Sequence, residues 1–520
     1  MGDRPMFLSF IIAVIPILWL MIALSKLKMP GFKACVIAFL LAAILAFTFQ
    51  KMPFLDVSTA ALEGALIALW PICLVIIAAL FTYNLTLETK AMEDIKGMLS
   101  TVSKDKRILM LLIGWGFGNF MEGMAGFGTA VAIPAGILMS LGLDPIRTVV
   151  ACLVVNSTPT AFGSVGVPTI TLASVAGVDP GVLSANVAVI QALLMFLSPF
   201  FMVVIIGGGI KALKGVFGIT LAATVSFTVP AFFTAKYVGP ELPDILGSIC
   251  CMICLTLYAL WFYRNRTDKD YLVETMAENT SKRLTFAQAV KAWCPFVLIF
   301  ILLLATSKLV PSINKPLSSI KSSIQIFTGA SAKKIGFTWI NTPGIIIFIA
   351  AAIGGLIQGA SLGRQLKVFG KTLKSNWKTI VTISSVVAAA KVMDYSGMVA
   401  NIAAFLVAVT GSYFPLISPL IGVIGAFVTG SGTSTNVLFG SLQAQTAAAI
   451  GASPEWLAAA NGMGAGIGKM ICPQGIAIGA AAVNAVGSES KILAKAVKYC
   501  IIFFVVAGLV CYFMPKMGLI

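Results

Sequence analysis

The sequence predicts an all-helical polytopic membrane protein with about 12 to 14 membrane elements, at roughly 20 residues for each span. Three observations lead to this prediction. Apolar residues make up 59% of the 520 residues and charged residues only 11%, whereas a soluble domain carries about 25% charged residues. Long uncharged runs recur along the chain, and segments interrupted by Gly and Pro recur at the same intervals in both halves.

Six long uncharged runs predict membrane-spanning helices, because about 20 apolar residues cross a hydrocarbon core. They cover residues 6–24, 65–87, 180–210, 215–235, 245–263 and 499–515. We interpret the first run as a span rather than a cleaved signal, because Lys26 and Lys28 follow it and no small-residue cleavage site does. The lipid bilayer is therefore the expected surroundings of the chain.

A spaced pattern occurs once in each half of the chain. Residues 156–168 (NSTPTAFGSVGVP) and 461–473 (NGMGAGIGKMICP) place Asn, Gly and Pro at the same intervals. Each copy is preceded by a G-x-F-x-x-G signature, at 118–123 and 425–430, and by a Gly-x-x-Pro step, at 142–145 and 451–454. Such paired interruptions are typical of the binding site of a transporter built from repeats. We therefore expect two inverted repeats with broken or re-entrant helices.

The net charge of +17 indicates a positive-inside topology and not nucleic-acid binding, because the basic residues lie in short loops. We assign six basic clusters to the cytoplasmic side: 26–33, 90–107, 211–214, 264–291, 364–378 and 491–498. Both termini then lie outside. Residues 90–107 hold five basic residues and the corresponding residues 397–413 hold none, so the two segments would face opposite sides, as inverted repeats require. The lysines between 308 and 334 do not follow the rule.

The motifs divide the chain into four expected parts. Residues 1–64 form N-terminal membrane helices, 65–214 the first repeat with transport motifs, 215–371 connecting helices with a hydrophilic loop at 264–291, and 372–520 the second repeat.

The sequence contains no histidine and ten cysteines, nearly all within apolar stretches. The only cysteine cluster, Cys250, Cys251 and Cys254, lacks the second pair or the histidines of a metal site. We therefore predict no metal site and no cofactor. Any proton coupling would have to use carboxylates, lysine or water, because the usual proton carrier near neutral pH is missing. An enzyme is not predicted, because no catalytic constellation is present.

Charges inside the membrane are costly and usually face a cavity or a partner. Glu122 is the only charge in residues 108–143, and Glu455 and Lys469 are the only ones in 395–488. Glu455 follows Pro454 at an expected helix start, where a carboxylate suits the helix dipole. Glu122 and Lys469 lie inside the repeated signatures, so we interpret both as functional.

Two further charges, Lys391 and Asp394, are three residues apart and could pair on one helical face. A structural ion pair and a coupling role are both open for them. The Gly-rich segments offer a different kind of site, since half-helix N-termini can bind a carboxylate through backbone N–H groups. Gly128, Thr129 and the hydroxyl-rich residues 430–436 are the candidates.

These motifs also carry a family resemblance. Residues 120–134 (FMEGMAGFGTAVAIP) resemble the F-x-E-G-x-A-G-F-G signature of the lactate permease family, which includes L-lactate and glycolate permeases. Residues 161–168 (AFGSVGVP) resemble its A-F-G-x-x-G-[IV]-P block, and residues 468–474 (GKMICPQ) resemble G-K-M-I-S-P-Q. The resemblance covers residues 108–499. It implies secondary active uptake of 2-hydroxymonocarboxylates with protons across a bacterial inner membrane.

Two positions depart from the family pattern. Gly432 stands where many relatives carry Asp in the F-V-T-G-S-[DG]-T-[ST]-[ST]-N block, and Cys472 stands where they carry Ser. The first departure removes a carboxylate, which bears on substrate range and coupling.

We therefore predict a transporter that works by alternating access. Lys469 is expected to complement the substrate carboxylate, and Glu122 to be the proton site, with Asp394 as a second coupling candidate. The other predicted substrate-binding residues are polar groups or helix ends: Asn156, Thr160, Thr433, Ser434, Asn436, Gln474, Gly128 and Thr129. The alternatives are a sodium-coupled or dicarboxylate carrier and, less favoured, an anion channel or a polytopic membrane enzyme.

Overall fold

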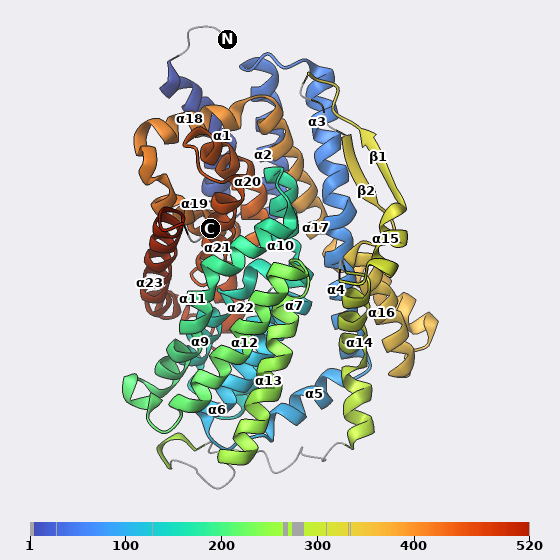
Figure 1. Ribbon diagram of the computed structural model, residues 1–520, viewed down its shortest axis with the longest axis vertical. Coiled ribbons are helices and arrows are strands. Elements are labelled where there is room, and N and C mark those ends of the chain that lie inside the picture. Colours follow the sequence, from blue (N-terminus) through green and yellow to red (C-terminus); the bar gives the residue numbers. More distant parts are fainter. Residues whose placement is uncertain are drawn as a thin grey trace.

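The computed structural model describes residues 5–518 except 26, 28, 127, 264–268, 273–284, 308, 331 and 333. Most of the predicted hydrophilic loop at 264–291 therefore lies outside the described residues. The described chain is helical apart from one β-hairpin (Figure 1). This confirms the predicted all-α polytopic class.

The first half of the chain contains α1 (Met6–Ser25), α2 (Gly31–Thr48), α3 (Phe54–Ile67), η1 (Ala68–Cys73), α4 (Leu74–Glu88), α5 (Ala91–Ser100), α6 (Lys106–Leu109), η2 (Met110–Phe117), α7 (Gly118–Met124), α8 (Thr129–Ser140), α9 (Pro145–Asn156), η3 (Pro159–Phe162), α10 (Gly163–Ala176), α11 (Pro180–Gly207), η4 (Ile210–Leu213), α12 (Phe217–Tyr237) and α13 (Pro243–Phe262). The second half contains η5 (Lys269–Tyr271), α14 (Phe286–Ala305), α15 (Pro311–Ser319), β1 (Lys321–Gln325), β2 (Lys334–Thr338), α16 (Pro343–Ile357), α17 (Leu362–Tyr395), α18 (Met398–Thr410), η6 (Gly411–Tyr413), α19 (Phe414–Thr429), α20 (Gly432–Ala449), α21 (Pro454–Lys469), α22 (Pro473–Ala482) and α23 (Glu489–Lys516).

The number of membrane elements agrees with the prediction. Among the described residues, eight helical segments are long and apolar enough to cross a membrane, or nine if the bent pair Pro145–Asn156 and Pro159–Ala176 counts as one span. Three shorter apolar helices follow the same composition, and with them the number of membrane elements is twelve: Met6–Leu20, Thr129–Ser140 and Pro343–Ile357. Twelve is the lower end of the expected range.

The same order of elements occurs twice. In the first half, α4 is followed by α5, the continuous α6, η2 and α7, and then α8 to α11. In the second half, α17 is followed by α18 to α23, and the short helices η3 and η6 lie within the two series. Both α5 and α18 begin after a left-handed residue, Lys90 (φ 62°) and Gly397 (φ 80°). Both α9 and α21 begin with a proline that follows a side-chain cap, Asp144 and Ser453. The breaks therefore recur where the sequence pattern places them, while the inverted orientation stays a prediction.

The two halves of the chain interlock around the middle of the molecule (Figure 1). Helix α10 of the first half packs against α20 and α21 of the second, and α22 of the second half packs against α8 and α9 of the first. Helices on either side of the breaks thus contact helices of the other half. A site formed at these breaks receives side chains from both halves of the chain.

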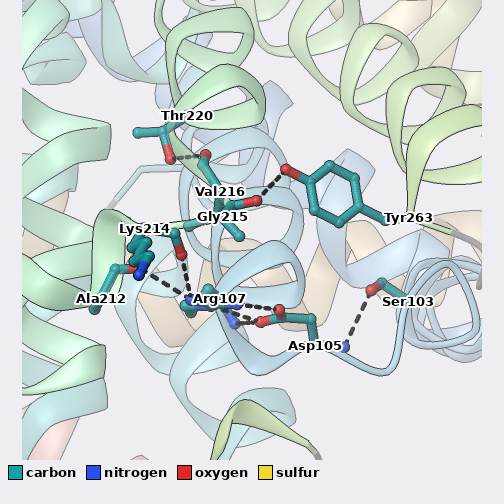
Figure 2. Close-up of polar contacts among 9 residues, drawn as sticks. All are labelled: Ser103, Asp105, Arg107, Ala212, Lys214, Gly215, Val216, Thr220 and Tyr263. Carbon is teal, nitrogen blue, oxygen red and sulfur yellow. Dashed lines mark hydrogen bonds and ion pairs between the residues drawn. The ribbon is translucent and has the colours of Figure 1, made fainter. Parts of the chain in front are cut away.

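A cluster of polar groups around the buried Arg107 joins loops at the lower end of Figure 1, and Figure 2 shows it in detail. The Arg107 guanidinium forms two hydrogen bonds with the Asp105 carboxylate and donates to the carbonyl oxygens of Ala212 and Lys214. Tyr263 donates to the carbonyl of Gly215. Arg107 is only 2% exposed, so the segment before η2 is fixed to the turn between α11 and α12.

The antiparallel hairpin of β1 and β2 is the one departure from helix among the described elements. It lies alongside α3 in Figure 1 and is joined to η1 through Trp70, whose Nε1 donates to the Thr338 carbonyl at 3.0 Å. Two of the lysines that did not fit the charge rule, Lys321 and Lys334, lie in this mostly exposed hairpin.

The four predicted parts of the chain stay a prediction. The boundary after residue 214 falls between η4 and α12, whereas the boundaries after 64 and 371 fall inside α3 and α17.

Candidate functional site

The first break in the helices places Glu122. Helix α7 ends at Met124, and α8 begins after Gly128, whose φ of 86° is left-handed and suits glycine. Glu122 therefore lies on the last turn of a helix that stops inside the protein. The Glu122 residue is only 2% exposed. Its carboxylate lies against Gly163, where an added Cβ would come within 2.6 Å of Oε1.

The second break, between α9 and α10, places Asn156 and Thr160. Helix α9 ends at Asn156, and the chain turns by 60° before the rest of the span. Ser164 and Val165 adopt left-handed conformations (φ 46° and 55°), which cost of order 1–3 kcal/mol each for residues other than glycine. The Ser164 hydroxyl donates to the Ala125 carbonyl at 3.0 Å. This bond ties the two breaks of the first repeat together.

The breaks of the second repeat place the remaining polar groups. Gly430 (φ 69°) ends α19, and the Ser431 side chain caps α20 by accepting the Ser434 N–H at 3.2 Å. The Cys472 sulfur caps α22 in the same way, accepting the Gly475 N–H at 3.2 Å. Cys472, one of the two departures from the family pattern, is therefore the N-cap residue of α22.

Lys469 is positioned by close packing of α21 against α19. A Cβ at Gly464 would meet the backbone oxygen of Pro419, and one at Gly468 would meet that of Val423. Small residues allow such backbone contact between membrane helices. The last residue of α21, Lys469, is thus held in place, and its side chain reaches Glu122 in the first half of the chain.

The structure brings Lys469 and Glu122 together. The Lys469 ammonium lies 2.9 Å from Glu122 Oε1, and the Asn156 amide donates to Oε2 at 3.1 Å. The side chains are 16% and 3% exposed, respectively, for Lys469 and Glu122. Both carboxylate oxygens are therefore occupied, one by a charge from the other half of the chain.

This ion pair faces a cavity of about 330 Å³, a volume at the small end of the range for ligand pockets. Eight predicted site residues line it: Glu122, Gly128, Asn156, Thr160, Thr433, Ser434, Lys469 and Gln474. The lining includes the first turns of α20 and α22 and the N-cap of α8. These N-terminal helix ends carry partial positive charge, so the cavity suits a small anion.

Three predicted site residues do not line this cavity. Thr129 donates to the Gly126 carbonyl at 2.6 Å and braces the break between α7 and α8. Asn436 donates to the Pro168 carbonyl at 3.0 Å and accepts from Asn461 at 3.0 Å, so it joins α20 to α10 and α21. Asp394 accepts hydrogen bonds from Ser441 and Gln445 of α20, at 2.8 and 2.7 Å.

The suggested pairing of Lys391 with Asp394 is wrong. The Lys391 ammonium lies 3.3 Å from Glu63 Oε1 on α3, and Tyr395 donates to the same oxygen at 2.6 Å. Because α17 packs against α3, Lys391 pairs with Glu63 of that helix. The spacing of residues along one helix cannot predict such a partner.

Sequence reasoning missed two charged residues near the site. Lys378 of α17 lines the cavity, although its basic cluster suggested a loop. Asp244 lies on the first turn of α13 and is fully buried. It directly precedes the uncharged run at residues 245–263. A charge at the edge of a run does not stand out in the sequence as one inside a run does.

A polytopic helical protein whose broken helices from both halves of the chain line a charged cavity has the architecture of a membrane transporter. Residues 9–517 match the family described as L-lactate permease. The chain belongs to the L-lactate permease family, and it is a multi-pass protein of the bacterial inner membrane.

Individual relatives agree with this assignment. An L-lactate permease of Streptococcus iniae is 44% identical over 86% of this chain and 93% of its own. The glycolate permease GlcA and an L-lactate permease of Escherichia coli K12 are 35% and 34% identical, each over 97% of this chain and 95% of theirs. These matches confirm the predicted family.

A solved structure supports the fold. The YdaH transporter of Alcanivorax borkumensis, described as having an unusual topology, matches with a TM-score of 0.51 over 93% of this chain and 98% of its own. At 15% identity, this likeness concerns the fold alone.

Proposed function

We propose that this protein carries L-lactate and related 2-hydroxymonocarboxylates such as glycolate by proton symport. The observation that carries the proposal is the ion pair of Lys469 and Glu122 inside the cavity. The relatives named as L-lactate and glycolate permeases support the substrate class.

The ion pair offers a direct way to couple a proton to an anion. The same ammonium cannot fully serve Glu122 and a substrate carboxylate at once, since charge-assisted hydrogen bonds are worth about 1.5–3 kcal/mol each. A proton on Glu122 removes its negative charge and releases Lys469 for the substrate. Proton and anion then enter the site together, and the net charge of the site does not change.

Groups around the ion pair would select a 2-hydroxy acid. Thr160, Thr433 and Ser434 present hydroxyls and Gln474 an amide to the cavity, and the helix ends of α20 and α22 add backbone donors. A substrate hydroxyl next to its carboxylate can be hydrogen-bonded by these groups while Lys469 holds the charge.

Alternating access would expose this site to each side in turn. The cavity wall is completed by Phe32 at the start of α2 and by Lys378, Thr379 and Thr382 of α17, helices outside the interlocked breaks. A relative movement between these helices and the breaks would open and close the cavity while the breaks that carry Lys469 and Glu122 stay next to each other.

A dicarboxylate carrier is the second candidate, and Lys378 is the observation that favours it. A second ammonium in the lining could hold a second carboxylate. Uptake of labelled mono- and dicarboxylates by wild type and Lys378→Gln would decide this: the monocarboxylate proposal expects selective uptake of 2-hydroxymonocarboxylates by both proteins.

The proposal as a whole is tested by uptake into proteoliposomes. We expect labelled L-lactate and glycolate to accumulate when an inward proton gradient is imposed, and a sodium gradient at equal pH to drive nothing. Accumulation with sodium alone would point to a sodium-coupled carrier, and flux that never exceeds equilibrium would point to a channel.

A further inference from the structure

The interface between α7 and α13 holds buried polar groups that the proposed cycle does not use. Asp244 is fully buried, and neither Oδ1 nor Oδ2 accepts a hydrogen bond from any described residue. Asn119 of α7 and Ser248 of α13 are equally buried, and their side-chain polar atoms are likewise unpartnered. Unsatisfied buried groups are rare in folded proteins and call for an explanation.

The way α7 packs against α13 places Asn119, Asp244 and Ser248 next to one another along the interface, and we call these three residues the strip. A Cβ at Gly116 would lie 2.8 Å from Met252 Cγ, and one at Gly123 would lie 3.2 Å from Asp244 Cβ. The two helices therefore run antiparallel, which places Asn119 level with Ser248, one turn along from Asp244.

The strip adjoins the ion pair. Gly123, which contacts Asp244, directly follows Glu122 in the chain. Glu122 and Lys469 are close enough to Asp244 to interact with it electrostatically. A carboxylate buried beside an ion pair, within a membrane span, is a functional candidate by its location.

Helix capping does not account for Asp244. The N-cap position of α13 is held by Leu242, whose side chain forms no cap hydrogen bond. By contrast, Asp179 at the start of α11 accepts the N–H groups of Gly181 and Val182, at 2.8 and 2.9 Å. Asp244 makes no such bond. Burying a charged group without a donor is costly, so a purely structural role would favour Asn or Ser.

We propose that Asp244, with Asn119 and Ser248 beside it, is a second proton-binding site of the transporter and exchanges its proton with Glu122. The O–H bond on Asp244 breaks and an O–H bond forms on Glu122, with a bridging water that accepts the proton from Asp244 and donates one to Glu122. The negative charge moves from Glu122 to Asp244, and Lys469 becomes available to the substrate while the net charge of the cluster is unchanged. This proposal rests on the proposed proton symport.

The test compares Asp244→Asn with Glu122→Gln and with the control Asp179→Asn in proteoliposomes. Substrate exchange without a gradient, accumulation driven by a pH gradient, and proton movement driven by a substrate gradient are measured for each. We expect Asp244→Asn to retain exchange and to lose both pH-driven accumulation and substrate-driven proton movement, while Asp179→Asn behaves as wild type.

The outcomes separate this inference from the proposed function. Asp244→Asn that accumulates substrate normally, while Glu122→Gln does not, overturns the role of Asp244 and leaves the symport proposal standing. Normal accumulation in both variants overturns both. A sodium-driven uptake that is lost in Asp244→Asn would make the strip a sodium site and would overturn the proton assignment.

A second variant keeps the test valid if Asp244→Asn does not fold. Asp244→Glu retains an acid but moves it along the strip, so the pH profile of uptake should shift from that of wild type while exchange at saturating substrate persists. An unshifted profile in a folded Asp244→Glu protein overturns the proposal.

Discussion

Lys469 and Glu122, which come from different halves of the chain, form an ion pair with 2.9 Å between Nζ and Oε1. The Asn156 amide holds the second oxygen of the same carboxylate. The expected substrate site and the expected proton site are therefore one connected unit, and occupation of one must change the energy of the other.

Removing the charge of Lys469 should weaken substrate binding. Loss of a charge-assisted hydrogen bond worth about 1.5–3 kcal/mol lowers affinity by about 10- to 150-fold in Lys469→Gln. Lys469→Arg should be intermediate, because a planar guanidinium does not replace a compact ammonium. Equilibrium binding of labelled L-lactate measures both. Lys495→Gln, an exposed position on α23, serves as the control, and unchanged affinity in both Lys469 variants would assign the lysine to structure.

A methyl group at Gly163 should disturb the Glu122 carboxylate. The added Cβ would lie 2.6 Å from Oε1, so the carboxylate must shift away from residue 163 and its contact with Lys469 must change, and overpacking typically costs about 1–3 kcal/mol. We expect Gly163→Ala to lower both pH-driven uptake and the melting temperature. Gly97→Ala is the matched control, because nothing lies within 4 Å of a Cβ there. Wild-type behaviour of Gly163→Ala would contradict the position of Glu122.

The Arg107 cluster of Figure 2 should contribute stability rather than transport specificity. Arg107→Met leaves the buried Asp105 without its partner, which typically costs about 3–5 kcal/mol. Arg364→Met removes an exposed pair with Glu88, 3.0 Å apart, and exposed pairs are worth about 0–1 kcal/mol. Thermal unfolding in detergent should therefore separate the two variants clearly. Equal melting temperatures would show that the Arg107 pair is dispensable.

The inverted orientation of the repeats predicts opposite accessibility of α5 and η6. Single cysteines at Glu93 and Ser412, both exposed, should react with impermeant reagents from opposite sides of the membrane in a cysteine-depleted background. Labelling from the same side would rule out the inversion, although the repeated order of helices would remain.

Much of the fold could be predicted from the sequence, because membrane spans and helix breaks each require a recognisable kind of residue. Apolar length sets the spans, and Gly and Pro mark the breaks. The pattern at residues 156–168 and 461–473 predicted that both halves would build one site, and the cavity contains residues from both.

Contacts that depend on helix packing could not be predicted. Spacing alone suggested Lys391 with Asp394, whereas α3 supplies Glu63 as the partner. Asn436 looked like a substrate ligand, yet its amide holds helices together. Asp244 differs from an ordinary helix-start carboxylate only in lacking donors, and that absence is visible only in three dimensions.

Proton coupling through Glu122 is tested most directly by comparing exchange and accumulation in Glu122→Gln. Glutamine mimics the protonated carboxyl and leaves Lys469 free, so substrate should still bind and exchange across the membrane. What should be lost is accumulation driven by a pH gradient. Retained exchange with abolished pH-driven accumulation is the predicted result, and accumulation that survives the substitution would contradict the account and move the proton site away from Glu122.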